Sequence, residues 1–239
     1  SFFEAHGLII NETKTKVTGR HANGDPLTEA LIWPGSNEPF EIVPPGKPIK
    51  HLGSLISIDL DWAPQINRMN ASVMATIAHL KSGRLSTLQA SVLTKYVTGP
   101  KMEIGMRHAD IPHDRLEKWD TWLAAALANR AGMASASLHR TGIEIICRID
   151  PLVDQYDLIK TSHMAEMLTR PTELREHYRT LMNPIITEID NLSSNWDTQN
   201  LATYKTQQTC YPTIAAALKR MALKGLRWNR NKKSRTHFQ

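Results

Sequence analysis

The chain has 239 residues, 41% of them hydrophobic and 22% charged, and a formal net charge of +6. This length accommodates one large domain or two small ones, and the apolar content excludes a mainly disordered chain. The sequence has no apolar run long enough for a membrane-spanning helix. Its two distant cysteines exclude a disulfide framework and indicate a reducing compartment.

Residues 1–62 are expected to form a strand-rich piece of a mixed or antiparallel sheet. A turn is predicted at 23–26, where the sequence reads Asn-Gly-Asp-Pro, and a loop at 34–48, which holds five prolines. Short apolar runs predict the strands, at 7–11, 30–33 and, interrupted by Gly53, 49–58.

After Trp62 the spacing of apolar residues changes to every third or fourth position, which predicts three amphipathic helices that bury one face each. The first begins near Pro64 and ends at Gly83, the second ends before Gly99-Pro100, and the third begins at Pro112. The predicted buried stripes are Ile66, Met69, Val73, Ile77 and Leu80; Leu85, Leu88, Val92 and Tyr96; and Leu116, Trp119, Leu123 and Leu127. We expect Ile66, Met69 and Val73 to face the same core as Leu88 and Trp119.

Further helices are predicted at 152–169, at 172–190 with a break or kink at Asn183-Pro184, and at 212–225. The fold class is therefore α+β: a small antiparallel strand-rich piece, then a mostly α-helical bundle and C-terminal helices. The predicted segments are a strand piece at 1–62, a three-helix bundle at 63–130, a helical extension at 131–190, a linker at 191–211, and a basic helix and tail at 212–239.

The net positive charge lies in the last segment. Residues 212–239 contain eight cations and no acid, whereas the other 211 residues carry 21 basic and 23 acidic side chains. Clustered cations gain affinity for nucleic acid by displacing its counterions, and Trp228 and Phe238 would stack on bases. A solvated tail remains the alternative. The cations of this segment are Lys219, Arg220, Lys224, Arg227, Arg230, Lys232, Lys233 and Arg235.

The sequence contains no self-sufficient active site. Phosphate-loop, nucleophile-elbow, zinc-protease and C-x-x-C patterns are all absent. Asp59 and Asp61 alternate as metal-binding carboxylates do, but turn residues are the more ordinary interpretation. His108 and His113 lack a third ligand nearby, and Cys147 lies in an apolar run typical of a core. No metal site and no cofactor are predicted.

Several segments resemble, in order, the reverse transcriptases of non-LTR retrotransposons. Residues 2–15, FFEAHGLIINETKT, resemble the F-x-x-x-G-L-x-I-N-x-x-K-T segment near the end of the palm domain. Residues 49–53, IKHLG, are similar to the primer-grip motif, with His51 in place of tyrosine. The helices after residue 62 are similar in spacing to the thumb, and Ile111-Pro112 and Thr141–Ile145 resemble later landmarks. The resemblance covers about residues 1–170.

The resemblance implies roles position by position. Lys14 falls on a lysine that protonates the leaving pyrophosphate, a general-acid role that applies only in a complete polymerase. His51, Leu52 and Gly53 fall on the primer grip, where a glycine lets backbone approach the nucleic acid. The thumb would lie along a duplex, with Arg68, Lys81, Arg84 and Lys95 as phosphate contacts.

The resemblance also implies that the catalytic carboxylates precede Ser1, so this chain contains no catalytic residue and would use Mg²⁺ only as part of a complete polymerase. Two functions remain open. The first is a non-catalytic RNA-binding or structural subunit of a ribonucleoprotein such as a mitochondrial ribosome. The second is a C-terminal palm and thumb fragment of an active RNA-directed DNA polymerase, which the mid-pattern start at Ser1 favours. An unrelated basic helical protein is the third interpretation.

The expected partners are nucleic acid, with RNA favoured, and either other ribonucleoprotein subunits or a separate palm chain; no membrane is expected. The expected location is intracellular, in the mitochondrion or the nucleus. Lys232-Lys233-Ser234-Arg235 would serve as a nuclear address, and a cleaved transit peptide would leave a start such as Ser1.

Overall fold

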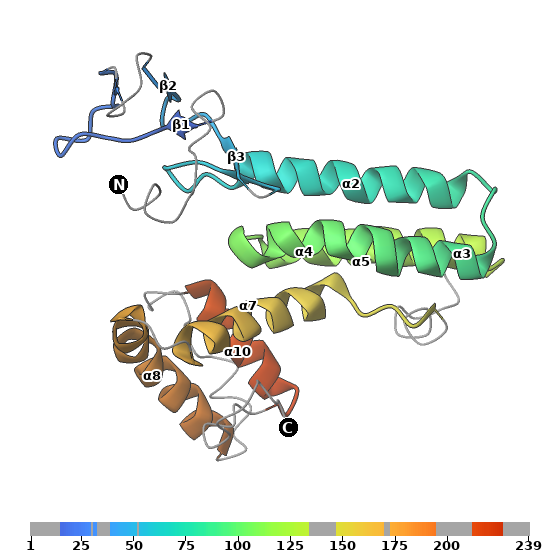
Figure 1. Ribbon diagram of the computed structural model, residues 1–239. Coiled ribbons are helices and arrows are strands. Elements are labelled where there is room, and N and C mark those ends of the chain that lie inside the picture. Colours follow the sequence, from blue (N-terminus) through green and yellow to red (C-terminus); the bar gives the residue numbers. More distant parts are fainter. Residues whose placement is uncertain are drawn as a thin grey trace, which may run out of the picture. The chain divides into compact units, whose positions relative to one another are not determined.

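The computed structural model describes residues 15–29, 31–32, 39–51, 53–133, 147–169, 173–194 and 212–226. The chain divides into two compact units, residues 1–68 and residues 69–239. Figure 1 shows the short strands of the first unit and the helices of the second. The fold class is α+β, as the sequence predicts, with one antiparallel strand pair and a helical bundle.

The described residues of the first unit form two separate strand pairs. β1 (Lys16–Val17) and β2 (Glu41–Ile42) are parallel, an arrangement that the expected mixed or antiparallel sheet leaves open. β3 (Ile49–His51) and β4 (Ser54–Ile56) pair antiparallel. The strand predicted at 7–11 lies outside the described residues, and of the one predicted at 30–33 Ile32 forms an isolated bridge with Pro39.

Gly53 interrupts the run from 49 to 58, as the sequence predicts, and the residues on its two sides pair with each other as a hairpin, the strand pair that the resemblance to a primer grip implies. Gly53 has a φ of +91°, a conformation that glycine adopts without the steric cost of a side chain, and it reverses the chain between β3 and β4. The turn predicted at 23–26 is confirmed. Gly24 there has a φ of +90°, and the side chain of Asn23 accepts a hydrogen bond from the backbone N–H of Asp25.

Helix α2 (Ala63–Lys81) follows the predicted apolar stripe closely. Met69, Val73, Ile77 and Leu80 are buried, each with at most 6% of its surface exposed, whereas Ile66 is half-buried. Asp61 Oδ1 accepts a hydrogen bond from the N–H of Ala63 at the start of the helix. After the helix ends, Gly83 adopts a φ of +77° in the connection to the next one.

The second helix continues through Gly99-Pro100, where the sequence predicts its end. It consists of α3 (Thr87–Val92), a π-helical turn η2 (Leu93–Thr98) and α4 (Gly99–His108). Proline lacks an N–H group, and its ring clashes with the carbonyl four residues earlier in an ordinary α-helix. The π-turn before Pro100 widens the helix, and the N–H of Gly99 bonds to the carbonyl of Thr94, five residues back.

This helix buries a different face from the one predicted. Leu88 is 75% exposed and Tyr96 is 65% exposed, so the expectation that Leu88 shares a core with Trp119 is wrong. The buried residues follow one another at steps of four: Ala90, Thr94, Thr98, Met102 and Met106. Steps of four drift by about 40° each in a regular α-helix, and the extra residue in the π-turn offsets that drift.

Helix α5 (His113–Arg130) completes the predicted bundle, and its stripe is buried as expected. The indole N–H of Trp119, which is fully buried, donates to Asn70 Oδ1 on α2 at 2.9 Å. The hydroxyls of Thr76 on α2 and Thr98 on η2 share a buried hydrogen bond of 2.7 Å. From Met69 onward, α2 therefore lies against both following helices (Figure 1).

The C-terminal helices form a second cluster in the same unit. α7 (Leu152–Thr169) packs against α4, α5, α8 (Glu173–Ser194) and α10 (Pro212–Leu223). Met164, Met182, Ile186, Ala215 and Leu218 belong to its apolar core. α10 is therefore part of the packed unit. α8 stays helical through Pro184, so of the predicted break or kink the break does not occur. Pro184 and Thr180 lie on the exposed side of the helix, where the carbonyl that proline leaves without an intrahelical donor is open to solvent. No described helix is long and apolar enough to cross a membrane.

Truncating one side chain on each face of the second helix tests which face is buried. We expect Met102→Ala to lower the free energy of unfolding by about 2–5 kcal/mol, because Met102 is fully buried. Leu88→Ala should change it by less than about 0.5 kcal/mol, because Leu88 faces solvent. Urea denaturation of the full chain measures both. A larger loss for Leu88→Ala than for Met102→Ala would contradict the observed register.

Candidate nucleic-acid interface

Two consecutive helices of the bundle come from a stretch of chain without acidic residues. Between Asp61 and Glu103 the sequence has no Asp or Glu and five Lys or Arg residues. This stretch forms α2, α3, η2 and the start of α4. Because no carboxylate offsets these cations locally, their surface attracts the phosphates of nucleic acid.

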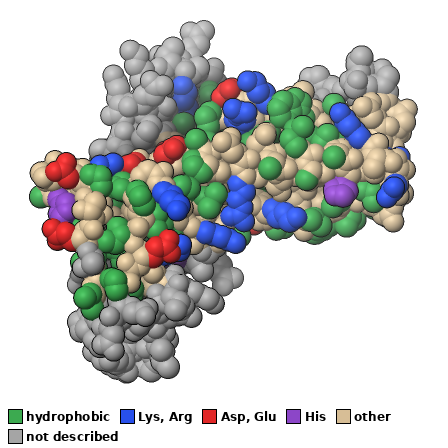
Figure 2. All heavy atoms as spheres, turned by 90° about the horizontal axis from the view of Figure 1, so that it is seen from above, with side chains coloured by type: hydrophobic (Ala, Val, Ile, Leu, Met, Phe, Trp, Pro, Cys, Tyr) green, Lys and Arg blue, Asp and Glu red, His purple; other side chains and the backbone are tan. Residues whose placement is uncertain are grey.

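Four of the five cations are exposed side chains of the second unit, namely Lys81, Arg84, Lys95 and Lys101. None of them forms an ion pair with an acid of the described residues. Figure 2 looks down on α2, and Lys and Arg side chains lie along the helix and around its C-terminal end, where no acidic side chain is visible. The sequence analysis names Lys81, Arg84 and Lys95 as phosphate contacts but not Lys101. The absence of Asp and Glu from this stretch is the signal that identifies Lys101.

Tyr96 adds an aromatic ring to this cationic surface. The sequence places it in the core, but its ring faces solvent beside Lys95, whose Nζ lies 5.7 Å from the ring centroid. Val92 and Leu88, one and two turns earlier on the same helix, are also exposed. An exposed aromatic ring among cations stacks on nucleic-acid bases while the cations contact phosphates. The arrangement has both components of a nucleic-acid surface.

The residues predicted for the primer grip lie in the first unit. Arg68 donates from Nη1 to the carbonyl of Gly53 at 2.7 Å, which fixes the β3–β4 turn. His51 is exposed at the end of β3, and its partner in the hairpin is Ser54. Lys14 and Leu52 lie outside the described residues. Arg68 is thus bonded to the turn that the resemblance identifies, rather than standing apart as a surface cation.

The two carboxylates considered as metal ligands have other partners. Asp59 receives hydrogen bonds from Nε and Nη2 of Arg20, each at 3.0 Å, and Asp61 caps the start of α2. His113 Nδ1 lies 3.3 Å from Glu117, a contact within α5. No group of three or more metal-ligating side chains occurs among the described residues. Cys147 is buried, as predicted for a core residue.

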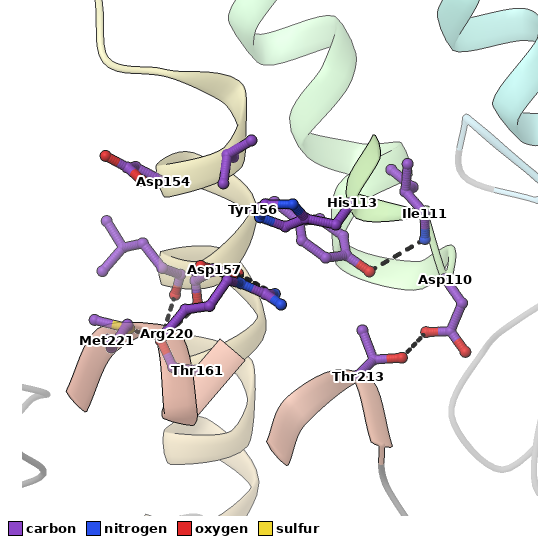
Figure 3. A network of polar contacts seen from close by, with 12 residues as sticks. Asp110, Ile111, His113, Asp154, Tyr156, Asp157, Thr161, Thr213, Arg220 and Met221 are labelled. Carbon is purple, nitrogen blue, oxygen red and sulfur yellow. Dashed lines mark hydrogen bonds and ion pairs between the residues drawn. The ribbon is translucent and has the colours of Figure 1, made fainter. Parts of the chain in front are cut away.

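Two of the predicted tail cations belong to the packing of α10 on α7. Arg220 pairs with Asp157 through three hydrogen bonds of 2.6 to 3.1 Å, and the Asp157 side chain is only 2% exposed. Lys224 pairs with Asp154 on the exposed side of α7. Figure 3 shows Arg220 beside Asp157. Arg220 therefore neutralises a buried acid and is unsuited to binding phosphate.

Lys219 is half-buried on the same helix. The remaining predicted cations of the tail lie outside the described residues: Arg227, Arg230, Lys232, Lys233 and Arg235.

The same network continues from α7 to the connection between α4 and α5. The hydroxyl of Tyr156 accepts from the N–H of Ile111 and donates to the carbonyl of Ala109. Burial raises the pKa of Tyr156 far above its ordinary value, so the phenol stays protonated. Burial lowers the pKa of Lys160, whose Nζ donates to the carbonyl of Arg107 at 3.3 Å. These buried ionisable groups have structural partners and do not line a reaction site.

A cavity of about 370 Å³ lies between η2, α4, α5 and α7. Leu123, Ala124, Leu127 and Leu158 contribute apolar surface to it, and Lys95 lines it as well. Its lining suits an apolar group better than a phosphate. Lys81, Arg84 and Lys101 are not among the residues that line it.

Comparison of the chain with models of known protein families, with curated proteins and with solved structures finds no match. The argument for a function therefore rests on the residues and their geometry.

Replacing Arg220 and Lys224 separately distinguishes structural cations from surface ones. Arg220→Met should lower the free energy of unfolding by about 3–5 kcal/mol, because it leaves the buried carboxylate of Asp157 unpaired. Lys224→Met, the matched control in an exposed pair, should cost less than about 1 kcal/mol. Urea denaturation provides both values. An Arg220→Met variant as stable as the parent chain would refute the structural role.

Proposed function

We propose that this chain is a non-catalytic RNA-binding subunit of a ribonucleoprotein, related by descent to reverse transcriptases. In this proposal the second unit holds an RNA helix by its phosphates, through the exposed side chains of the acid-free stretch between Asp61 and Glu103. The observation that carries the proposal is the exposure of Lys81, Arg84, Lys95 and Lys101 without any acidic partner among the described residues.

The shape of the surface supports an RNA helix as the ligand. The cations lie on two neighbouring helices and their connection. The Thr76–Thr98 hydrogen bond joins these two helices, and the Asn70–Trp119 hydrogen bond joins α2 to α5. RNA helices are recognised mainly through their phosphates, 2′-hydroxyls and shape, because side chains do not reach into the deep major groove. Tyr96 would then stack on an unpaired base at the end of a helix or in a bulge.

The alternative is a C-terminal palm and thumb fragment of an active RNA-directed DNA polymerase. The β3–β4 hairpin favours it, because Gly53 makes a tight turn at the position of the primer-grip motif and Arg68 holds the carbonyl of that turn. A missing palm would then supply the paired carboxylates and the Mg²⁺. Nucleic-acid binding by the helices is common to both proposals.

Substituting Lys95 and Tyr96 tests the binding surface. With an RNA duplex of about 16 base pairs that ends in an unpaired overhang, we expect Lys95→Gln to lower the affinity several-fold. It should also make the slope of the logarithm of the binding constant against the logarithm of salt concentration shallower by about 0.9, the effect of one lost phosphate contact. Tyr96→Ala should lower the affinity at least about fivefold and leave the salt dependence unchanged, because stacking releases no counterions. Fluorescence anisotropy over a range of salt concentrations gives both quantities.

Lys118→Gln is the matched control, since Lys118 is an exposed lysine of α5 that lies 3.6 Å from Asp114. Its affinity and salt dependence should equal those of the parent chain. Equal losses for Lys95→Gln and Lys118→Gln would show that any cation serves, and the proposed surface would be wrong.

Purification of the native particle separates the two functions. A stable set of proteins with one structural RNA supports the ribonucleoprotein subunit. Recovery with a palm that carries paired aspartates, together with template-dependent DNA synthesis, supports the polymerase instead.

A further inference from the structure

The connection between α2 and α3 gathers three cations at one corner of the second unit. Lys81 ends α2, Arg84 follows in the connection, and Arg130 ends α5. A methyl group placed on Gly83 would lie 3.9 Å from Nη1 of Arg130, so the guanidinium reaches the backbone between Lys81 and Arg84. The sequence did not single out Arg130.

The guanidinium of Arg130 lacks an acceptor. Its Nε is shielded from solvent and has no hydrogen-bond partner among the described residues. Arg130, Lys81 and Arg84 also form no ion pair with any acid of that part of the chain. Nε itself has no room for an acceptor, but an arginine is always charged and no described acid neutralises this one, so the corner favours an anion at the terminal guanidinium nitrogens, one of which lies beside Gly83.

The ends of two helices at this corner do not cancel the positive charge. The C-terminal carbonyls of α2 and α5 contribute roughly half a negative charge each. They account for the presence of a cation at each helix end. The three side chains contribute three full positive charges, so a net attraction for an anion remains.

We propose that Arg130, Lys81 and Arg84 form a site for a phosphate group, with the terminal guanidinium nitrogens of Arg130 as donors to phosphate oxygens. The forked donors of a guanidinium match phosphate geometry, and the two exposed cations supply attraction from either side of Gly83. This proposal deepens and rests on the proposed function, because a phosphate of an RNA helix lying on the acid-free surface would occupy the site. Free inorganic phosphate has the same chemistry.

The Nε–H resonance of Arg130 in the full-length chain, observed by NMR, tests the site directly. We expect it to shift and to saturate when an RNA duplex of about 16 base pairs is added. Arg130→Gln should lower the affinity for that duplex roughly tenfold and reduce the steepness of its salt dependence by about 0.9. Arg115→Gln, an exposed arginine near the start of the same helix, should change neither quantity.

Inorganic phosphate, titrated alone, separates the sources of the anion and the two proposals. If the duplex does not bind the parent chain but phosphate shifts the Arg130 resonance to saturation, the phosphate site stands and the RNA-binding function fails. If the duplex binds but the resonance does not move and Arg130→Gln binds normally, the site is wrong and the function stands.

Arg130→Lys keeps the charge and the aliphatic stem, so it serves if Arg130→Gln fails to fold. It should also bind the duplex more weakly, because lysine lacks the forked donors of a guanidinium. Unchanged affinity in folded Arg130→Lys would overturn the role of the guanidinium.

Discussion

Pro100 determines which side chains of the second helix face solvent. A proline inside a helix removes one hydrogen bond and crowds the preceding turn. Here the helix does not end before Pro100 but widens into a π-helical turn and continues. The wider turn keeps small residues such as Ala90, Thr94 and Thr98 on the buried side. Lys95 and Tyr96 therefore face outward, and the surface that we propose for RNA depends on this one local adjustment.

The cations of the second unit divide into two groups by what lies beside them. Arg220 belongs to the α7–α10 contact, where a buried carboxylate makes it part of the fold. Lys81, Arg84, Lys95 and Lys101 come from a stretch that contains no carboxylate, so no described acid neutralises them. Charge counted along the sequence identifies the second group, because its stretch contains no acid. It misplaces Arg220, which lies in the most basic segment and yet pairs with an acid on another helix.

The apolar periodicity predicts α2 and α5 well, because their large apolar residues are also their buried ones, as with Val73 and Trp119. It fails on the second helix, where alanine and threonine are among the buried residues and large side chains such as Leu88 face solvent. A threonine hydroxyl is buried at little cost when it pairs with another, as Thr98 does with Thr76. The pairing of Arg220 depends on Asp157, a partner distant in the chain, which a local pattern does not show.

A lysine-reactivity footprint of the full chain tests directly whether RNA lies on the exposed cations of the acid-free stretch in the second unit. Lysine reactivity is read by mass spectrometry with and without an RNA duplex of about 16 base pairs. We expect Lys81, Lys95 and Lys101 to become less reactive when the duplex binds, while Lys118 on α5 reacts as before. Protection confined to Lys232 and Lys233 in the C-terminal tail, or equal protection of Lys118, would contradict it.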